Sequence, residues 1–362
     1  MINADARDRY WMQLCIQLAR EARGYTSPNP MVGSVVVKNS RLIGHGFHPK
    51  PGEPHAEVFA LRDAGEAAGG ATLYVNLEPC NHTGRTPPCT EAILQAGVAR
   101  VVAGIVDPNP LVAGKGLARL QAAGVEAIAG VEEAACRELN EAFFHSIIHH
   151  RPFGILKYAM TLDGKIATVS GHSQWVSGEA ARAIVHDVRG GCDAVVVGGN
   201  TVRQDDPQLT CRLVTGRNPL RVVMTKDGDR LPGEAKLWHT DVAPTLVLAE
   251  QISDTRRDDL ERRGVDVESF LNLSPALASG ILYKRGCISV LWECGGMLAA
   301  EALRDLVIQK VMAFVAPKLV GGLSAPGPIA GEGMPLMSEA LPLTNVRDRQ
   351  IGSDRLIEGY LA

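Results

Sequence analysis

The chain has 362 residues, of which 46% are hydrophobic and 21% are charged, and this balance is typical of folded globular proteins. Its length is sufficient for two domains of ordinary size. The net charge of −3 gives no basic excess of the kind that binds nucleic acids or anionic membranes, so we expect neither partner. A small phosphate-bearing ligand is not excluded, because a few local cations suffice to bind it.

The N-terminal stretch MINADARDRY lacks the apolar segment of a signal peptide, and no apolar run reaches the ~18 residues of a membrane span. We therefore expect a cytoplasmic protein. Stable disulfides are rare in that compartment, so we do not expect the eight cysteines to form a disulfide framework. Most of them are expected to be buried apolar residues.

The first half is predicted to alternate between helices and strands. Apolar residues at helical spacing indicate a first helix over 9–23, and β-branched runs indicate the strands. Such alternation is typical of an open α/β sheet with layers of helices. The predicted helices are 9–23, 55–65, 89–97, 114–124 and 132–150, and the predicted strands are 33–39, 71–77, 100–107 and 125–130.

The pattern changes after the helix predicted over 132–150, where Pro152 follows. We therefore place a domain boundary here and predict domains at 1–149 and 150–362. The second half alternates again and is predicted to be a second α/β domain with its own core. Its clearest segments are FGILKYAMT, GEAARAIVHDVRGGCDAVVVGG, LRVVMT, TLVLA, CISVLWE and KVMAFVAP.

Four residues of the first half follow the order expected of a zinc-dependent deaminase. His55 and Glu57 stand in PHAEVF, and Cys80 and Cys89 stand in LEPCNHTGRTPPCTEA. The order His-x-Glu, then Pro-Cys, then a second Cys is the signature of zinc nucleobase deaminases. Eight residues separate the two cysteines, whereas two are usual. We predict that His55, Cys80 and Cys89 bind Zn²⁺.

The chemistry of deamination explains these residue types. One imidazole and two thiolates leave the fourth position of zinc to water, whose pKa falls toward ~7. A carboxylate must then move a proton from that water to the ring nitrogen and the departing ammonia, and Glu57 is the candidate catalytic residue. Taken singly, each of these residues is more often structural. Their order in the chain favours the zinc site.

Longer sequence blocks resemble the bifunctional deaminase–reductase family of riboflavin biosynthesis. The family joins a diaminohydroxyphosphoribosylaminopyrimidine deaminase to a 5-amino-6-(5-phosphoribosylamino)uracil reductase, and the long spacing between the two cysteines is its usual form. The resemblance spans nearly the whole chain. The matching blocks are SPNPMVG, GHGFHPKPGEPHAE, LEPCNHTGRTPPCTEAI, DPNPLVAGKG, LQAAGV, KYAMTLDGKIAT, SQWVSG, VRGGCDAVVVGGNTVRQDDPQLTCR and LIEGYL.

The resemblance implies a cytidine-deaminase-like α/β/α domain that binds a pyrimidine ribotide carrying a phosphate. It places Asn29, His48, Arg85, Asp107 and Asn109 at substrate positions. Amide and carboxylate groups can read the donors and acceptors of the ring, while His48 and Arg85 are expected to hold the phosphate. Asn-Pro and Asp-Pro pairs also simply form turns, which is the alternative for Asn29, Asp107 and Asn109.

The resemblance also implies a dihydrofolate-reductase-like C-terminal domain that uses NADPH to reduce the ribosyl group to a ribityl chain. No G-x-G-x-x-G fingerprint follows a predicted strand. Two strand–glycine–helix junctions, VVVGGNT and WECGGMLAAEAL, can instead present amides to a phosphate. The implied cofactor residues are Ala159, Trp175, Thr201, Asp205, Gly295, Gly296 and Met297. The implied substrate residues are Lys157, Ser173, Arg189, Leu209, Arg212 and Glu293.

Several alternatives stay open for the second half. If the resemblance does not hold, we expect Trp175 to be a packing residue and Arg189 to be a solvated charge on a helix. Arg189 and Arg212 are candidates to hold the phosphate, and Asp205 and Glu293 are both candidates to assist proton transfer.

Two other functions stay open for the whole chain. A nucleic-acid base deaminase shares the zinc chemistry, but the lack of a basic stripe argues against it. A chain in which one half has decayed into a scaffold is the non-catalytic alternative. The resemblance further implies a homo-oligomer, either a dimer or a tetramer.

Overall fold

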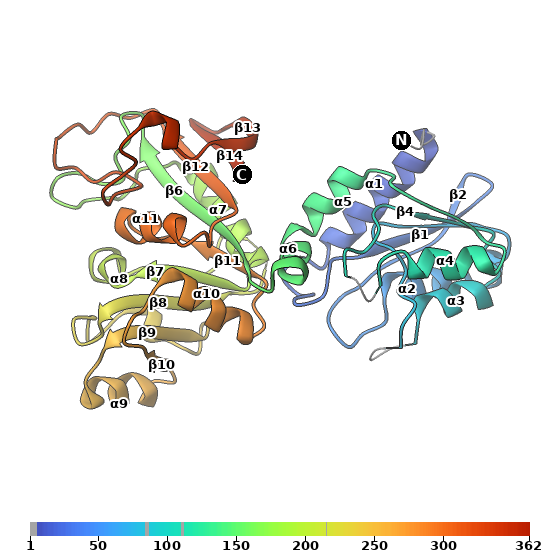
Figure 1. The fold of residues 1–362 in the computed structure, drawn as a ribbon, viewed down its shortest axis with the longest axis horizontal. Helices are drawn as coiled ribbons and strands as arrows, with labels where there is room; N and C mark the ends of the chain where they lie inside the picture. Colours follow the sequence, from blue (N-terminus) through green and yellow to red (C-terminus); the bar gives the residue numbers. More distant parts are fainter. Residues whose placement is uncertain (1–5, 84–86, 110–111, 215) are drawn as a thin grey trace. The chain divides into compact units, whose positions relative to one another are not determined.

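The computed structural model describes residues 6–83, 87–109, 112–214 and 216–362. The chain forms two compact units that divide between His150 and Arg151. Each unit is an α/β structure built on its own sheet, so the predicted fold class is confirmed (Figure 1).

The first unit contains one sheet of five short strands. The strands are β1 (Gly33–Lys38), β2 (Arg41–Phe47), β3 (Thr72–Val75), β4 (Arg100–Ala103) and β5 (Glu126–Ala129). They lie in the order β2-β1-β3-β4-β5. Strand β1 is antiparallel to β2 and β3, whereas β3, β4 and β5 are parallel. Parallel neighbours need crossover connections, which helices supply here.

Helices cover both faces of this sheet. They are α1 (Ala6–Arg20), α2 (Ala56–Ala64), α3 (Cys89–Gln95), α4 (Lys115–Ala122), α5 (Glu133–Leu139) and α6 (Glu141–His149), with a 3-10 turn η1 (Gly65–Ala68). α1 and α5 lie together on one face, and α2, α3 and α4 on the other, which gives three α/β/α layers (Figure 1). Gly33 lets α1 approach β1, because a Cβ at this position would lie 2.1 Å from the carbonyl oxygen of Cys15.

The first unit differs from the prediction in two places. The helix predicted over 132–150 is two helices that meet at Asn140, whose side chain accepts from the Met31 amide at 2.8 Å and donates to its carbonyl at 2.9 Å. Strand β2 has no counterpart in the prediction, because Gly44 and Gly46 lower strand propensity. A Cβ at Gly44 would lie 2.3 Å from the carbonyl oxygen of Ala60 in α2, so the glycine permits this packing.

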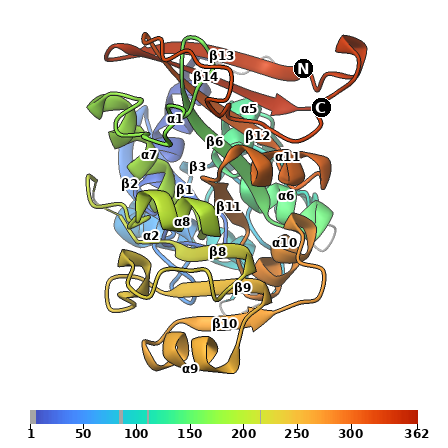
Figure 2. The ribbon, with the colours of Figure 1, turned by 90° about the vertical axis from the view of Figure 1, so that its left-hand side faces the viewer.

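The second unit contains a larger sheet. Its strands are β6 (Phe153–Thr161), β7 (Ala194–Gly198), β8 (Leu220–Asp227), β9 (Thr245–Gln251), β10 (Asp266–Ser269), β11 (Ser289–Trp292), β12 (Lys310–Ala316), β13 (Leu343–Ile351) and β14 (Asp354–Leu361). The order is β10-β9-β8-β7-β11-β6-β12-β14-β13 (Figure 2). The strands from β10 to β12 are parallel, and β14 and β13 join as an antiparallel hairpin.

Helices also cover both faces of the second sheet. They are α7 (Glu179–Gly191), α8 (Gly199–Asp205), α9 (Asp254–Arg262), α10 (Pro275–Lys284) and α11 (Gly296–Arg304), with 3-10 turns η2 (Lys236–Trp238) and η3 (Met337–Glu339). Val195 and Val197 of β7 pack in one core with α7, α8 and α9, whereas Val196 packs in a second core with α10 and α11. This alternation follows from the two-residue period of a strand buried on both faces.

The prediction omits β10, β13 and β14. β13 is exposed along nearly its whole length, and its sequence LTNVRDRQI has no alternating apolar pattern that would mark it as a strand. No helix of the described residues is long and apolar enough to cross a lipid bilayer.

Candidate active sites

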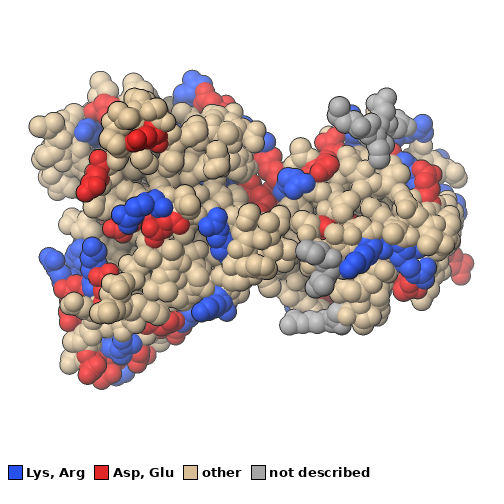
Figure 3. All heavy atoms as spheres, viewed as in Figure 1, with Lys and Arg blue, Asp and Glu red and all other residues tan. Residues whose placement is uncertain are grey.

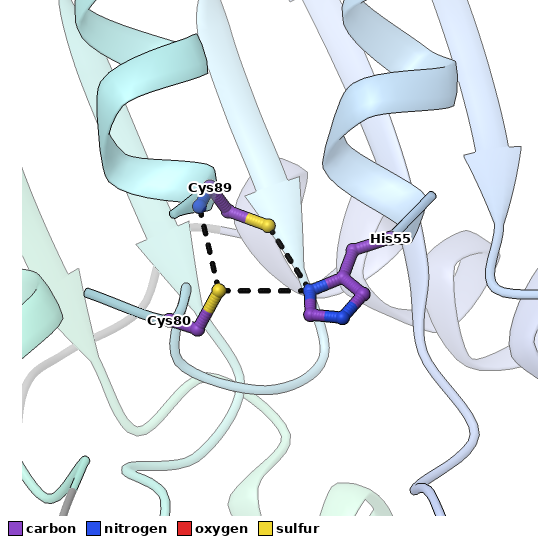
Figure 4. Close-up of side chains that lie close together, drawn as sticks. All are labelled: His55, Cys80 and Cys89. Carbon is purple, nitrogen blue, oxygen red and sulfur yellow. Dashed lines mark hydrogen bonds between the residues drawn. The ribbon is translucent and has the colours of Figure 1, made fainter. Parts of the chain in front are cut away.

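Three metal-binding side chains meet at the N-terminal ends of two helices of the first unit (Figure 4). His55 is the N-cap residue of α2, Cys89 is the first residue of α3, and Cys80 lies in the loop after β3. The His55 Nδ1 atom is 3.2 Å from Cys89 Sγ and 3.6 Å from Cys80 Sγ. All three donor atoms lie within 4.8 Å of one another, and the described residues contain no second group of this kind.

The geometry of this group fits a zinc ion. Zn–S bonds of about 2.3 Å and Zn–N bonds of about 2.0 Å at tetrahedral angles place a nitrogen and a sulfur ligand about 3.6 Å apart. The distance from His55 to Cys80, 3.6 Å, equals this value, and the distance from His55 to Cys89, 3.2 Å, is somewhat shorter. One imidazole and two sulfurs also match the ligand preference of zinc and leave a fourth position to water.

The protonation of the two cysteines favours the binding of a cation. Hydrogen bonding with the Cys89 thiol lowers the pKa of Cys80 well below its usual range, and the same interaction raises the pKa of Cys89. The backbone amide of Cys89 donates to Cys80 Sγ at 3.4 Å. The pair therefore favours one thiolate already, and a zinc ion displaces the remaining thiol proton.

Glu57 lies one residue into α2 and is 3% exposed. Its Oε2 atom is buried and has no hydrogen-bond partner among the described residues. Burial raises the pKa of Glu57 to about 7. A carboxylate whose free oxygen is buried beside a zinc site is suited to accept and release a proton near neutral pH.

Asn29 and His48 form a pair near the predicted zinc ligands. Asn29 Nδ2 lies 3.1 Å from His48 Nε2, and His48 Nδ1 lies 3.0 Å from the carbonyl oxygen of Pro54. The His48 ring contacts the His55 ring edge to face. His48 is 2% exposed, and burial lowers its pKa. Both ring nitrogens of His48 are therefore engaged within the protein, and its contact with the phosphate stays a prediction.

The loop after β4 contains the other two ring-binding candidates. Asp107 is buried, and its Oδ1 accepts from the amide of Asn109 at 2.8 Å, as in an Asx turn. Burial raises the pKa of Asp107, and the negative charges of Glu78 and Cys80 contribute. Asp107 therefore lies near the zinc ligands as well as in a turn. Arg85 lies outside the described residues.

The sequence analysis did not single out Glu78, although it stands two residues before Cys80. Its buried carboxylate accepts hydrogen bonds from backbone amides of the segment 107–117. An acidic residue two positions before a predicted metal ligand is a signal that the sequence does contain.

The second unit contains a pocket of about 1040 Å³ beside the C-terminal end of β7. In an α/β sheet such ends are where ligands usually bind. Both strand–glycine–helix junctions contribute to it, and the glycines of WECGGMLAAEAL stand at the start of α11. All reductase residues implied by the resemblance line the pocket: Lys157, Ala159, Ser173, Trp175, Arg189, Thr201, Asp205, Leu209, Arg212, Glu293, Gly295, Gly296 and Met297.

A buried group of charges stands in the pocket wall. The Glu293 carboxylate accepts from Arg189 Nη2 at 2.9 Å and from Lys157 Nζ at 3.5 Å. Burial opposes its ionisation, but the two cations outweigh burial and lower the pKa of Glu293 to about 2. Burial lowers the pKa of Lys157. Glu293 is therefore a fixed anion, and Lys157 is the member of this group whose proton is easiest to release.

Other pocket residues occupy different environments. Ser173 Oγ donates to Asp205 Oδ1 at 2.9 Å, which leaves Asp205 as a hydrogen-bond acceptor. Trp175 is 59% exposed, and the Arg182 guanidinium lies 4.6 Å from its ring centroid. A large aromatic ring exposed in a pocket is available to a planar ligand and is not a core packing residue.

His186 lines the same pocket and was not singled out in the sequence analysis. Burial and the neighbouring Arg189 and Arg212 lower its pKa to about 4, so its ring is neutral at neutral pH. The signal for it was its place one turn before Arg189 on α7.

Comparison with known protein families gives two matches. Residues 152–357 match the RibD C-terminal domain, and residues 5–105 match the cytidine and deoxycytidylate deaminase zinc-binding region. The first match covers more than half of the chain, and the second contains His55, Cys80 and Cys89. The zinc-binding deaminase domain and the NADPH-using reductase domain account for both expected cofactors.

Individual relatives are similar to this chain over nearly its whole length. The riboflavin biosynthesis protein RibD of Synechocystis is 56% identical, over 98% of this chain and 96% of the relative. The solved structure of Acinetobacter baumannii RibD is 39% identical, with a TM-score of 0.86 over 98% of this chain and 99% of that one. A Thermotoga maritima structure, named as a diaminohydroxyphosphoribosylaminopyrimidine deaminase/5-amino-6-(5-phosphoribosylamino)uracil reductase, is 36% identical, with a TM-score of 0.85 and the same coverage. The chain therefore belongs to the RibD family of bifunctional deaminase–reductases of riboflavin biosynthesis.

Proposed function

We propose that residues 1–149 and 150–362 catalyse two successive reactions on one phosphorylated pyrimidine. The first half deaminates 2,5-diamino-6-(5-phosphoribosylamino)pyrimidin-4(3H)-one. The second half reduces the ribosyl group of the product and gives 5-amino-6-(5-phosphoribitylamino)uracil. The observation that carries the first reaction is the free, buried oxygen of Glu57 beside three zinc-type ligands.

In the first reaction, His55, Cys80 and Cys89 would hold a zinc ion. Bound zinc lowers the pKa of water and so supplies a nucleophile at neutral pH. Glu57 would carry one proton of the attacking water to the ring nitrogen and the other to the departing amino group. One water is consumed, the C–N bond to the amino group breaks, and ammonia leaves.

The ring of the substrate is recognised by amides and a carboxylate. Asn29 and Asn109 each offer a donor and an acceptor, and Asp107 accepts a hydrogen bond from a ring N–H or amino group. The His48–Asn29 contact orients the amide of Asn29. Arg85 is the candidate phosphate ligand, because it remains charged at every physiological pH.

In the second reaction, NADPH bound by this unit would supply the hydride, which the carbon that joins the sugar to the pyrimidine amine accepts. That carbon becomes reactive when the ribose ring opens. The ring oxygen needs a proton as its bond to carbon breaks, and the Lys157 ammonium can supply it. One hydride and one proton are consumed, which balances the conversion of ribosyl to ribityl. Glu293 stays ionised, so it holds Lys157 and Arg189 in place and does not donate a proton.

The substrate phosphate of the second reaction is assigned to Arg212. Arg189 has three of its N–H groups engaged with Glu293 and the Thr210 carbonyl. Arg212 lines the pocket, and no carboxylate pairs with it among the described residues. An unpaired guanidinium is the better ligand for a phosphate.

We further propose a cytoplasmic homo-oligomer, either a dimer or a tetramer. Large apolar side chains of the second unit are exposed between β12 and β13, as at Leu319 (76%), Leu323 (104%) and Met337 (89%). A cluster of exposed apolar residues is common where copies of a chain associate. Figure 3 shows Lys and Arg scattered among Asp and Glu on the face in view, which does not favour a nucleic-acid partner.

The proposal is tested with the full chain and the diaminopyrimidine ribotide as substrate. We expect bound zinc, release of ammonia, and then oxidation of NADPH. Glu57→Gln should retain zinc and lose ammonia release, while reduction of the deaminated product continues. Ammonia release at the wild-type rate from Glu57→Gln would contradict the role of Glu57.

A further inference from the structure

Glu78 connects two parts of the deaminase site that are distant in sequence. It stands two residues before Cys80, and it is 4% exposed. Its Oε2 accepts from the amides of Asp107 at 3.2 Å and Gly114 at 2.9 Å. Its Oε1 accepts from the amides of Gly116 at 2.9 Å and Leu117 at 3.2 Å.

These contacts require a group that only accepts. An ionised carboxylate has two oxygens with about four lone-pair directions, and it can serve four N–H donors together. A glutamine at this position would present an NH₂ group to two of the four amides and leave them unsatisfied. Buried amides without a partner are costly, so the segment would move away from the side chain.

The segment that Glu78 holds is the one with the ring-binding candidates. The amide of Asp107 binds Glu78 directly, and the Asp107 carboxylate in turn binds the amide of Asn109. The other three donors belong to the N-cap and first turn of α4. The first turn of α4 also packs closely against the backbone next to Glu78, since a Cβ at Gly116 would lie 2.0 Å from the Pro79 carbonyl oxygen.

We propose that Glu78 is a positioning residue of the deaminase, which fixes the pyrimidine-reading segment around Asp107 relative to the zinc-ligand loop at Cys80. This inference rests on the proposed deamination of a pyrimidine by the first unit. Because the metal ligands also contact one another directly, loss of the Glu78 contacts would displace the ring-binding segment and leave the ligands together. A displacement of this kind weakens substrate binding more than it disturbs the metal.

The test is Glu78→Gln in the full-length zinc protein. We expect the KM for the ribotide to rise about tenfold, with kcat within about threefold and zinc content unchanged. The matched control is Glu91→Gln, which removes the same charge from a solvent-exposed ion pair between α3 and Arg119 of α4. The control should leave KM unchanged, because exposed pairs contribute little.

A second variant separates positioning from general destabilisation. Asp107→Asn should also raise KM, and Glu78→Gln should add no more than about twofold to it in the double variant. Fully additive effects would overturn the inference, as would an unchanged KM in Glu78→Gln while Asp107→Asn raises it. If Asp107→Asn leaves KM unchanged, the proposed role of Asp107 fails. A tenfold rise in Glu78→Gln then still supports positioning of the segment, and an unchanged KM overturns it.

Gly114→Ala serves if Glu78→Gln does not fold or lacks zinc. Gly114 has φ +73°, with no atom within 4 Å of an added Cβ, so alanine fits but strains the backbone at one donor of Glu78. We expect a several-fold rise in KM with zinc retained. An unchanged KM in this variant would overturn the inference.

Discussion

The two candidate active sites are built in different ways. In the candidate deaminase site, His55 and Cys89 stand at the N-terminal ends of α2 and α3. Cys80 lies in a loop, and its sulfur accepts a hydrogen bond from the Cys89 amide. Backbone hydrogen bonds close to these ligands in sequence help to hold them in place. The reductase site is a pocket of about 1040 Å³ whose charged centre joins β6, α7 and the end of β11 through side chains alone.

This difference has consequences for what each site tolerates. A metal site needs a few donors at fixed distances, and each donor is indispensable. A large pocket that binds a dinucleotide and a sugar phosphate spreads its binding energy over many contacts. We therefore expect single substitutions to abolish the first activity and to reduce the second by graded amounts.

The largest effect is expected from Cys89→Ser. A serine oxygen is a poorer zinc ligand than a thiolate, so zinc should be lost and ammonia release should fall below about one-thousandth of the wild-type rate. Reduction of the deaminated substrate should not change, because the reductase pocket is lined by second-unit residues. Zinc analysis and the two separate assays measure this.

Cys136→Ala is the control for removing a buried thiol. Cys136 is fully buried in the same unit and is not one of the three grouped ligands. It should keep zinc and ammonia release. Full deamination by zinc-free Cys89→Ser would contradict the comparison of the two sites.

Lys157→Met should lower kcat of the reductase by about 10²- to 10³-fold, because the sugar ring oxygen loses its proton donor. Ammonia release and zinc content should be those of the wild type. Lys157→Arg keeps the charge but releases its proton far less readily, so it should restore little activity. Lys284→Met, at an exposed position at the end of α10, is the control. Wild-type kcat in Lys157→Arg would show that the charge, and not the proton, is what matters.

The architecture of each unit could be predicted where local pattern determines it. Runs such as VVV at 35–37 and at 195–197 predict strands because β-branched residues suit a buried sheet. The break of α5–α6 at Asn140 could not be predicted, because it depends on a contact with Met31 more than 100 residues away in sequence. The exposed β13 has no alternating pattern of its own, because its pairing with β14 is what makes it a strand.

The residues of the two candidate sites also differ in how far they could be predicted from the sequence. His55, Glu57, Cys80 and Cys89 stand in a diagnostic order, so sequence alone indicated the deaminase chemistry. The reductase residues came from the family resemblance, because Lys157, Arg189 and Glu293 are separated by up to 136 residues and meet only in the folded pocket. The neutral state of His48 also needed the structure, since it follows from burial and from Asn29 and Pro54.

Arg212→Ala should have a smaller effect on the reductase than loss of Lys157. If Arg212 holds the substrate phosphate, KM should rise about tenfold while kcat stays within about twofold. The KM for NADPH should not change. Arg262→Ala removes an arginine from the exposed face of α9 and is the control. A drop in kcat with unchanged KM would assign Arg212 to the chemical step instead.

The smallest effect is a shift in the pH profile of the reductase. Lys157 acts in its protonated form, so activity is present below the pKa of Lys157 and is lost as the pH rises through it. Burial lowers this pKa and the charge of Glu293 opposes the decrease. Glu293→Gln removes that charge, so the pKa of Lys157 falls further and the alkaline limb of kcat moves to lower pH. An alkaline limb that stays in place, or moves to higher pH, would show that the proton in this step comes from a group other than Lys157.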